Sequence, residues 1–149
     1  MNRHILMADV IHSGEEPSNE LMENFKSVVE KINSDFRSQL LSPFTITLGD
    51  EFQGIVSCVS SGVKVLIAFE EAILAKDRPF QLRYVFHEGE VDTAINPDRA
   101  HEMLGPGLTY ARRALNDLKG AASRFNISLV DKEQSMRLNQ LFVLYRHFV

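Results

Sequence analysis

The sequence predicts an α+β fold: a mostly antiparallel sheet with helices packed on one face. Short runs that alternate apolar and polar residues are interleaved with longer runs whose apolar residues recur at helical spacing. In chain order these runs read strand, helix, strand, strand, helix, strand, helix, strand, which is the order of a split βαβ, or ferredoxin-like, sheet. The length of 149 residues and the apolar share of 44% are those of one globular domain that buries its own core.

The first strand and the first helix are predicted over residues 4–11 and from Ser18 to about Phe36. Residues 4–11 are a short apolar run interrupted by one charge, Asp9, as in a central strand. Ser18 is the expected N-cap, because apolar residues recur at helical spacing directly after it. Pro43 stops this helix and its flank.

A β-hairpin is predicted next. Residues 44–48 and 52–56 are rich in aromatic and β-branched residues, and the tight polar turn Gly49-Asp50-Glu51 separates them. We therefore expect Asp50 and Glu51 at the tip of the hairpin. Turns rich in Gly and Asp are common, so the turn alone does not predict a site.

The remaining elements follow from the same two periodicities. They are a helix over about residues 60–76, a strand over 80–87, a helix over 104–122 and a short strand over 127–130. An apolar helical stripe then runs from Leu138 to the last residue. We expect one α/β domain over residues 1–130 and a C-terminal helix over residues 131–149, which either packs back on the sheet or begins a truncated further segment.

The charge balance argues against one class of function. Lys and Arg number 16 and Asp and Glu number 20, which gives a net charge of −4. A domain built mainly to bind the nucleic-acid backbone usually carries excess positive charge. We therefore expect no direct nucleic-acid binding by residues 1–130, whereas nucleotide binding through metal ions stays open.

Two further features bear on location and redox chemistry. The N-terminus lacks the pattern of a signal peptide, and no apolar run approaches the ~20 residues of a membrane span. The expected location is therefore cytoplasmic, with no membrane partner. Cys58, the single cysteine, lies in an apolar stretch and is expected to be a buried structural thiol.

Asp9 is the first candidate for a functional residue. A carboxylate buried without a partner in an apolar strand costs roughly several kcal/mol, so something must compensate it. Its place near the carboxyl end of a strand, just before a loop and a helix, is where open α/β sheets hold ligand-binding groups. The alternative is an aspartate that caps a helix or forms a salt bridge.

Asp50 and Glu51 strengthen the case for a metal site. In a split βαβ sheet their hairpin lies next to the first strand, so these carboxylates and Asp9 are expected at one end of the sheet. Carboxylates that lie so near to one another repel each other unless a hard divalent cation such as Mg²⁺ binds between them. The three residues are therefore predicted metal ligands.

Several motifs together resemble known families. Residues 7–11, 45–52, 87–90 and 105–113 follow the order of motifs in class III nucleotidyl cyclases. A closer resemblance is to the SatD family of bacterial proteins, and it is carried by residues 44–54, 95–97 and 105–106. The similarity extends over residues 5 to about 118.

The resemblance implies the cyclase or polymerase palm and assigns roles at its site. Asp9 and Asp50 match the two metal-binding catalytic aspartates, and the Val10 carbonyl is a further implied ligand. The implied cofactor is Mg²⁺ or Mn²⁺, which activates the attacking hydroxyl and neutralises the triphosphate. The residues implied to contact the phosphates are His12, Ser13 and Gly14.

The resemblance also assigns residues on the third helix. Arg113 matches the cyclase arginine that stabilises transition-state charge, a role that its planar fork suits. Thr109 stands where cyclases carry an asparagine that orients the substrate, and is the implied nucleotide contact there. The chain departs from the pattern a second time at Ile46, where cyclases carry a base-reading lysine.

Two functions follow as hypotheses. The first is a divalent-metal-dependent nucleotide-binding palm, either a divergent nucleotidyl cyclase or a binder of a nucleotide or other phosphate ligand. The second is a catalytically silent SatD-like regulatory or interaction module linked to a DNA-binding segment, because a further segment of SatD relatives resembles a helix-turn-helix. A homodimer is implied as well, since cyclases place the metal residues and the helix arginine on opposite subunits.

Overall fold

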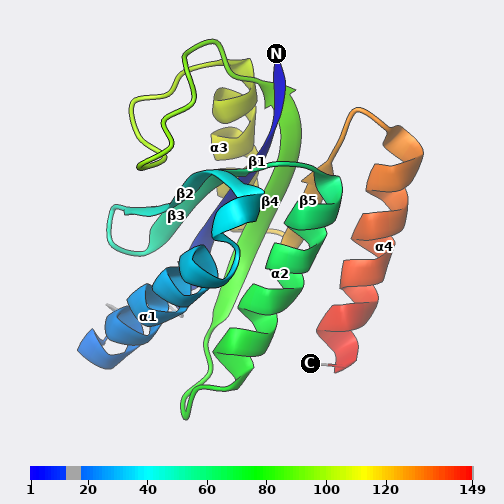
Figure 1. Cartoon of the computed structure of the whole chain (residues 1–149). Helices are drawn as coiled ribbons and strands as arrows, with labels where there is room; N and C mark the ends of the chain where they lie inside the picture. The colour runs from blue at the N-terminus through cyan, green and yellow to red at the C-terminus, as the bar shows by residue number, and fades with distance from the viewer. Residues whose placement is uncertain (13–17, 149) are drawn as a thin grey trace.

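The computed structural model describes residues 1–12 and 18–148, and within them five strands form one sheet in the order β2-β3-β1-β4-β5 (Figure 1). The strands are β1 (Asn2–Ile11), β2 (Leu40–Thr47), β3 (Glu51–Val56), β4 (Gln81–Glu90) and β5 (Phe125–Ser128). Neighbouring strands are antiparallel except for β4 and β5, which are parallel. The predicted α+β class and the mostly antiparallel sheet are confirmed.

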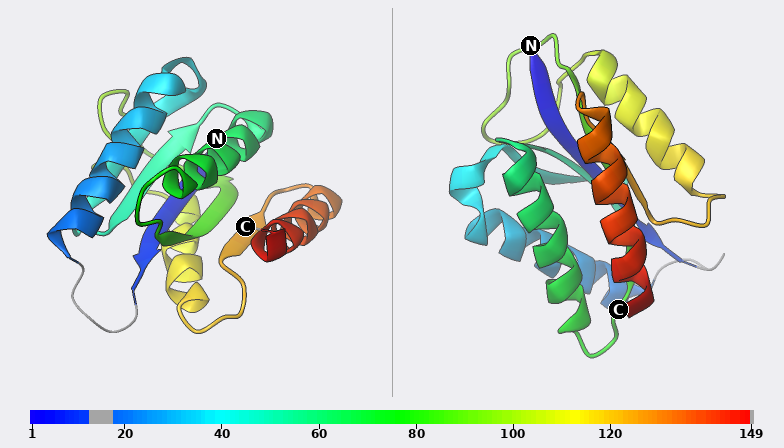
Figure 2. Two further views of the ribbon diagram at one scale, coloured as in Figure 1. Left: turned by 90° about the horizontal axis from the view of Figure 1, so that it is seen from below. Right: turned by 90° about the vertical axis from the view of Figure 1, so that its right-hand side faces the viewer.

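Helices cover both faces of this sheet (Figures 1 and 2). The helices α1 (Asn19–Asp35), α2 (Val59–Leu74) and α4 (Lys132–Phe148) lie on one face, and α3 (Pro106–Leu118) lies on the other. A short 3-10 turn, Arg37–Gln39, leads into β2. The expectation of helices on one face holds for α1, α2 and α4, and α3 departs from it.

The central strand β1 has apolar side chains on both faces of the sheet, and helices cover both faces. Its apolar residues divide between two hydrophobic clusters. Leu6, Ala8 and Val10 pack with α1 and α2, whereas Ile5 and Met7 pack with α3. Because both faces of β1 are covered, the strand is a continuous apolar run without the polar alternation of a half-exposed strand.

Local interactions explain where the first helix begins and where the hairpin turns. Ser18 is the N-cap of α1, as predicted, because its hydroxyl accepts a hydrogen bond from the Leu21 N–H at 3.1 Å. The hairpin turns through Leu48 (φ 54°) and Gly49 (φ 83°), both in the left-handed region that glycine adopts readily and leucine does not. Asp50 ends this turn, and β3 begins directly after it.

The loop between β4 and α3 is fastened to the hairpin. Ala100 is fully buried, its carbonyl accepts a hydrogen bond from Gln53 Nε2 at 2.6 Å, and its N–H donates to Thr45 Oγ1 at 2.8 Å. At the start of α3, a Cβ on Gly107 would lie 2.7 Å from the carbonyl carbon of Gly89 on β4. The loop is therefore held against the hairpin, and the start of α3 is held against β4.

The C-terminal helix α4 packs against β5. Phe142 is 1% exposed, and its ring stacks on Phe125 with centroids 4.8 Å apart. Beside this stack, the Glu70 carboxylate on α2 accepts hydrogen bonds from the Tyr84 hydroxyl at 2.8 Å and from Arg124 at 2.6 Å. The outer side of α4 exposes several apolar side chains. These include Met136, Leu141 and Leu144.

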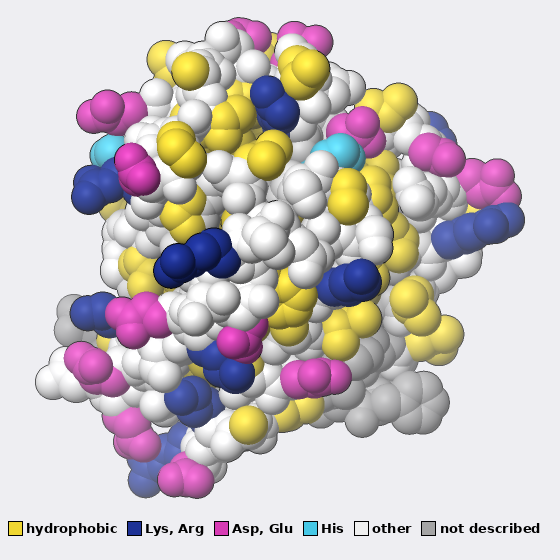
Figure 3. All heavy atoms as spheres, viewed as in Figure 1, with side chains coloured by type: hydrophobic (Ala, Val, Ile, Leu, Met, Phe, Trp, Pro, Cys, Tyr) yellow, Lys and Arg dark blue, Asp and Glu magenta, His cyan; other side chains and the backbone are white. Residues whose placement is uncertain are grey.

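Three surface observations complete the description. On the face shown in Figure 3, acidic and basic side chains are interspersed. Within residues 1–12 and 18–148, no helix is both long and apolar enough to cross a bilayer. Cys58 is exposed, so the expectation of a buried thiol is wrong: β3 ends two residues earlier, and Cys58 is the N-cap of α2 at the edge of the core.

Candidate functional site

Three charged side chains lie side by side at one end of the sheet. Asp9 on β1 is directly opposite Glu51 on β3 and Arg83 on β4. Directly opposed residues in a sheet project from the same face, and alternate residues of one strand do so too. Asp9 therefore shares the face of Met7, which packs with α3. Strand pairing thus gathers three charges near the carboxyl end of β1.

Asp9 is buried between two cations. It is 2% exposed, its Oδ1 accepts a hydrogen bond from Arg83 Nε at 2.8 Å, and its Oδ2 lies 3.9 Å from Lys119 Nζ, just after α3. Burial raises the pKa of the Asp9 carboxyl above its ordinary value, while the hydrogen bond and charge of Arg83 and the charge of Lys119 oppose that rise. Ion pairs therefore compensate this carboxylate, which is the alternative that the sequence left open.

Glu51 is held in a similar way. It is 6% exposed and forms an ion pair with Arg112, which comes from α3. Its charge also acts to raise the pKa of Asp9, so the two carboxylates are near neighbours. We call the group of Asp9, Glu51, Arg83, Arg112 and Lys119 the charge cluster. It contains two carboxylates and three cations, which leaves one positive charge in excess.

Asp50 has different partners. Its backbone carbonyl accepts a hydrogen bond from the Val10 N–H at 2.9 Å. Its side chain is 31% exposed, and its Oδ2 lies 3.5 Å from His12 Nε2. The structure therefore brings Asp50 together with His12, and Asp9 together with Glu51. Among the described residues, no three His, Cys, Asp or Glu side chains group as a metal site.

The donor atoms at this end of the sheet suit a hard divalent cation, but the surrounding charges do not. The residues predicted to bind Mg²⁺ or Mn²⁺ are Asp9, Val10, Asp50 and Glu51. They offer the oxygen ligands that these ions prefer. However, Arg83 and Lys119 already face both oxygens of Asp9. Two unit charges about 4 Å apart repel by about 4 kcal/mol at an effective dielectric constant near 20, and a divalent ion doubles that repulsion. Metal binding stays a prediction, and at Asp9 the two cations oppose it.

The α3 residues predicted from the cyclase pattern lie on the outer surface. Thr109 and Arg113 are exposed and one helical turn apart. The Thr109 hydroxyl donates to the Gly105 carbonyl at 3.3 Å. Arg112 is the arginine that reaches the sheet, through its ion pair with Glu51. The predicted phosphate contacts Ser13 and Gly14 lie outside the described residues.

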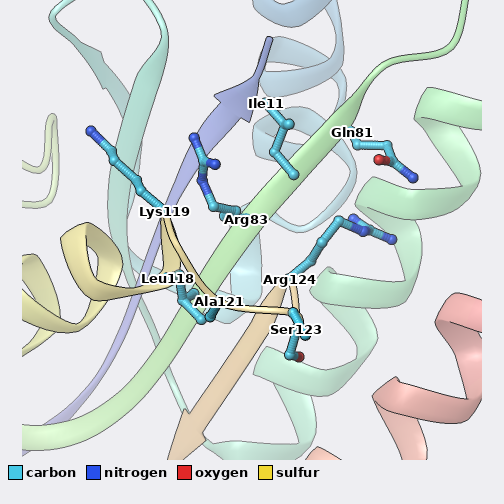
Figure 4. Close-up of a pocket in the computed structure, with 9 residues that line it drawn as sticks. Ile11, Gln81, Arg83, Leu118, Lys119, Ala121, Ser123 and Arg124 are labelled. Carbon is cyan, nitrogen blue, oxygen red and sulfur yellow. The ribbon is translucent and has the colours of Figure 1, made fainter. Parts of the chain in front are cut away.

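A hollow of ≈ 300 Å³ adjoins the charge cluster (Figure 4). Its lining includes Ile11, Gln81, Arg83, Lys119, Ser123 and Arg124. The Arg83 side chain is 17% exposed, and within the described part of the chain its guanidinium makes no hydrogen bond except through Nε. Figure 4 shows the Arg83 and Lys119 side chains extending toward the same side of the hollow. The terminal N–H donors of Arg83 are therefore available to a ligand.

An open groove of ≈ 720 Å³ lies between the hairpin, the loop before α3 and α3 itself. Its lining includes Thr47, Gln53, Met103, Arg112, Asn116 and Lys119. The Thr47 hydroxyl oxygen is buried and has no hydrogen-bond partner among the described residues. Lys119 lines both the groove and the hollow.

Two cations of the charge cluster were not predicted from the sequence. Arg83 occupies an ordinary polar position in the alternation of β4, and Lys119 lies just beyond the last helical turn of α3. The signal that identifies Arg83 is its pairing opposite Asp9, which depends on strand register. Arg112 was recognisable only as one of two adjacent arginines on a helix.

The sequence model of the SatD family matches residues 4–145, almost the whole chain. This chain belongs to the SatD family. The resemblance that the motifs predicted is thereby confirmed. No curated protein matches this SatD-family chain.

Solved structures similar to the SatD-family chain include catalytic domains of guanylyl cyclases. The monomeric guanylyl cyclase domain of the RhoGC fusion protein from the aquatic fungus Blastocladiella emersonii aligns with a TM-score of 0.59 and 12% identity, over 77% of this chain and 74% of that one. The guanylate cyclase domain of RhGC from Catenaria anguillulae, in complex with GTP, aligns with a TM-score of 0.55 and 13% identity, over 77% and 72%. A rhodopsin-guanylyl cyclase catalytic core with converted specificity, in complex with ATPαS, aligns with a TM-score of 0.55 and 13% identity, over 77% and 71%. The cyclase-like palm fold is confirmed.

Proposed function

We propose that this SatD-family domain binds a nucleoside phosphate at the charge cluster. The observation that carries the proposal is the convergence of Arg83 and Lys119, from different elements, on a hollow at the carboxyl end of β1. The excess positive charge of the cluster favours an anion, and the planar fork of an arginine suits phosphate oxygens. Two similar cyclase structures hold GTP and ATPαS, which makes a nucleotide the first ligand to test.

The two spaces that share Lys119 suit different parts of such a ligand. The hollow presents cations to phosphates, whereas the groove presents amides and apolar groups from Gln53, Asn116 and Met103 to a nucleoside. Thr47 also lines the groove, but its hydroxyl oxygen is buried and is not counted as a ligand contact. The proposed orientation therefore places the phosphates near Arg83 and the base toward the hairpin.

The proposal is one of binding, and it includes a homodimer. Ile46 and Thr109 replace the base-reading lysine and the substrate-orienting asparagine of the cyclase pattern, so neither position supplies the side chain that would orient a substrate for cyclisation. Thr109 and Arg113 lie exposed on α3, outside the charge cluster of their own chain. A second copy would bring them to that cluster.

A second function is favoured by the ion pairs of Asp9. Because both carboxylate oxygens already face cations, the palm is compatible with a catalytically silent regulatory module. On this alternative the domain mediates interactions while a linked segment binds DNA. It predicts a folded protein that binds none of the common nucleotides.

A thermal-shift panel of GTP, ATP and their diphosphates, each with Mn²⁺, with Mg²⁺ or with EDTA, tests the proposal. We expect at least one nucleotide to raise the melting temperature of the wild type, and Lys119→Ala to lose the shift. Lys64→Ala is the matched control, because Lys64 is an exposed lysine on α2, on the opposite face of the sheet. Unchanged melting temperatures across the whole panel would contradict nucleotide binding and favour the silent module.

A further inference from the structure

We infer that Arg83 and Lys119 hold the phosphates of the ligand directly, in the place where a cyclase palm uses divalent metal ions, with Asp9 as their shared counter-ion. The inference rests on the proposed function, because it concerns how the same site binds its ligand. The two hypotheses predict opposite effects of divalent metal on ligand affinity: the metal hypothesis predicts that metal strengthens binding, and this inference predicts that metal weakens it.

The first step concerns the two oxygens of Asp9. Oδ1 lies 2.8 Å from Arg83 Nε, and Oδ2 lies 3.9 Å from Lys119 Nζ. A metal ion at either oxygen of Asp9 would meet the positive charge of the group that already faces it. The neighbouring carboxylate Glu51 is no alternative ligand in this arrangement, because it is paired with Arg112.

The second step concerns the orientation of Arg83. The bond from its Nε to Asp9 fixes the plane of the guanidinium, and the rest of the side chain is largely enclosed. The terminal N–H groups have no other hydrogen-bond partner among the described residues, and Arg83 is one of the residues that line the hollow. A guanidinium held in this way is oriented before the ligand arrives, so less conformational entropy is lost on binding.

The third step concerns Lys119. Its side chain is 50% exposed and its Nζ is 3.9 Å from Asp9, so it is held more loosely than Arg83. Lys119 can therefore move from the carboxylate onto a phosphate without leaving the site. Arg124 also lines the hollow, but its charge is used by Glu70.

These steps predict that divalent metal weakens binding. Mg²⁺ complexes a triphosphate and cancels two of its negative charges, and it adds positive charge beside Arg83 and Lys119. The ligand that the cluster prefers is therefore the metal-free polyphosphate. A site that binds through Asp9-bound metal would show the opposite dependence.

Isothermal titration of the full chain with inorganic triphosphate tests the inference. We expect binding in EDTA that weakens severalfold in excess Mg²⁺. Lys119→Gln should weaken binding in EDTA by about tenfold or more, whereas Lys64→Gln should leave it unchanged. Arg83→Lys keeps the positive charge but loses the planar guanidinium, and it should also weaken triphosphate binding in EDTA. Because this substitution is small, it is less prone to unfold the protein than Arg83→Ala.

The outcomes separate the inference from the proposed function. Binding that appears only with Mg²⁺ or Mn²⁺, and that Asp9→Asn abolishes, would overturn the inference and leave nucleotide binding standing. Binding in neither condition, with triphosphate or with any nucleotide, would overturn the proposed function itself. Binding in EDTA that persists in Asp9→Asn would support the inference, because that variant keeps both cations.

Discussion

Among single residues, Asp9 is the most deeply buried member of the charge cluster. Its 2% exposure excludes water, so Arg83 and Lys119 supply the interactions that water gives an exposed carboxylate. The two partners are unequal. The Arg83 side chain is 17% exposed and that of Lys119 is 50% exposed, so solvent screens the second ion pair far more than the first.

We expect Arg83→Ala to lower the free energy of unfolding by about 3 kcal/mol, because it leaves a buried carboxylate with only a screened partner. Lys119→Ala should cost less than about 1 kcal/mol. Urea denaturation measures both, and adding Asp9→Asn to Arg83→Ala should recover part of the loss because the uncompensated charge is gone. Equal losses in the two single variants would contradict the unequal roles of the cations.

At the scale of elements, β4 joins the two layers of the molecule. It pairs with β1 and β5, and α3 packs on it. His87 of β4 contacts both β5 and α3. Its Nδ1 lies 2.7 Å from Ser128 Oγ on β5, and its ring stacks on the Tyr110 ring of α3 with centroids 4.1 Å apart. Burial lowers the pKa of His87 below its ordinary value, against the hydrogen bond to the Ser128 carbonyl and the charge of Glu88, which raise it.

This depressed pKa predicts a pH dependence of stability. The stabilisation is complete above the ordinary pKa of histidine, and it is lost as the pH falls through the folded-state pKa, because the unfolded chain takes up the proton first. Between about pH 7.5 and about pH 5.5, the wild type should therefore lose more unfolding free energy than His87→Gln. His101→Gln, which changes an exposed loop histidine, is the control. Equal pH slopes for the wild type and His87→Gln would show that His87 is not the group responsible.

Elements that depend on neighbours in the sequence were predictable, and contacts that depend on pairing were not. The cap at Ser18 and the existence of a hairpin with a turn at Gly49 follow from local residue preferences, whereas the placement of Glu51 at the tip was wrong, because the turn begins one residue earlier and Glu51 starts β3. The position of Arg83 opposite Asp9 follows from strand register, to which local patterns do not respond. Likewise, the apolar run of β1 indicated a buried strand without showing that α3 would cover its second face.

At the scale of the whole molecule, the predicted site residues fall into separate places. Asp9 lies in the charge cluster, whereas Thr109 and Arg113 are exposed on the outer surface of α3. One chain therefore carries two partial sets of residues that do not meet within it. A homodimer with two-fold symmetry would complete both sets at once.

Mixing two variants tests this arrangement. Lys119→Gln and Arg113→Gln should each lose nucleotide binding alone, but their mixture should recover about a quarter of the wild-type sites, because half of the random dimers contain one site with neither change. Binding capacity by titration, with mass from light scattering, measures the effect. A monomeric mass with full binding, or no recovery in mixed dimers, would contradict a shared site.

The fastening of Ala100 to the hairpin has a consequence for such an assembly. The segment from β4 to α3 is tied to Gln53 and Thr45 at one point, and α3 is pressed against β4 at Gly107. This segment is therefore attached at two points, to the hairpin and to β4. In the homodimer that we propose, any shift of α3 by the partner subunit would also displace the hairpin to which Ala100 is hydrogen-bonded, so we expect self-association and ligand binding at the charge cluster to change together.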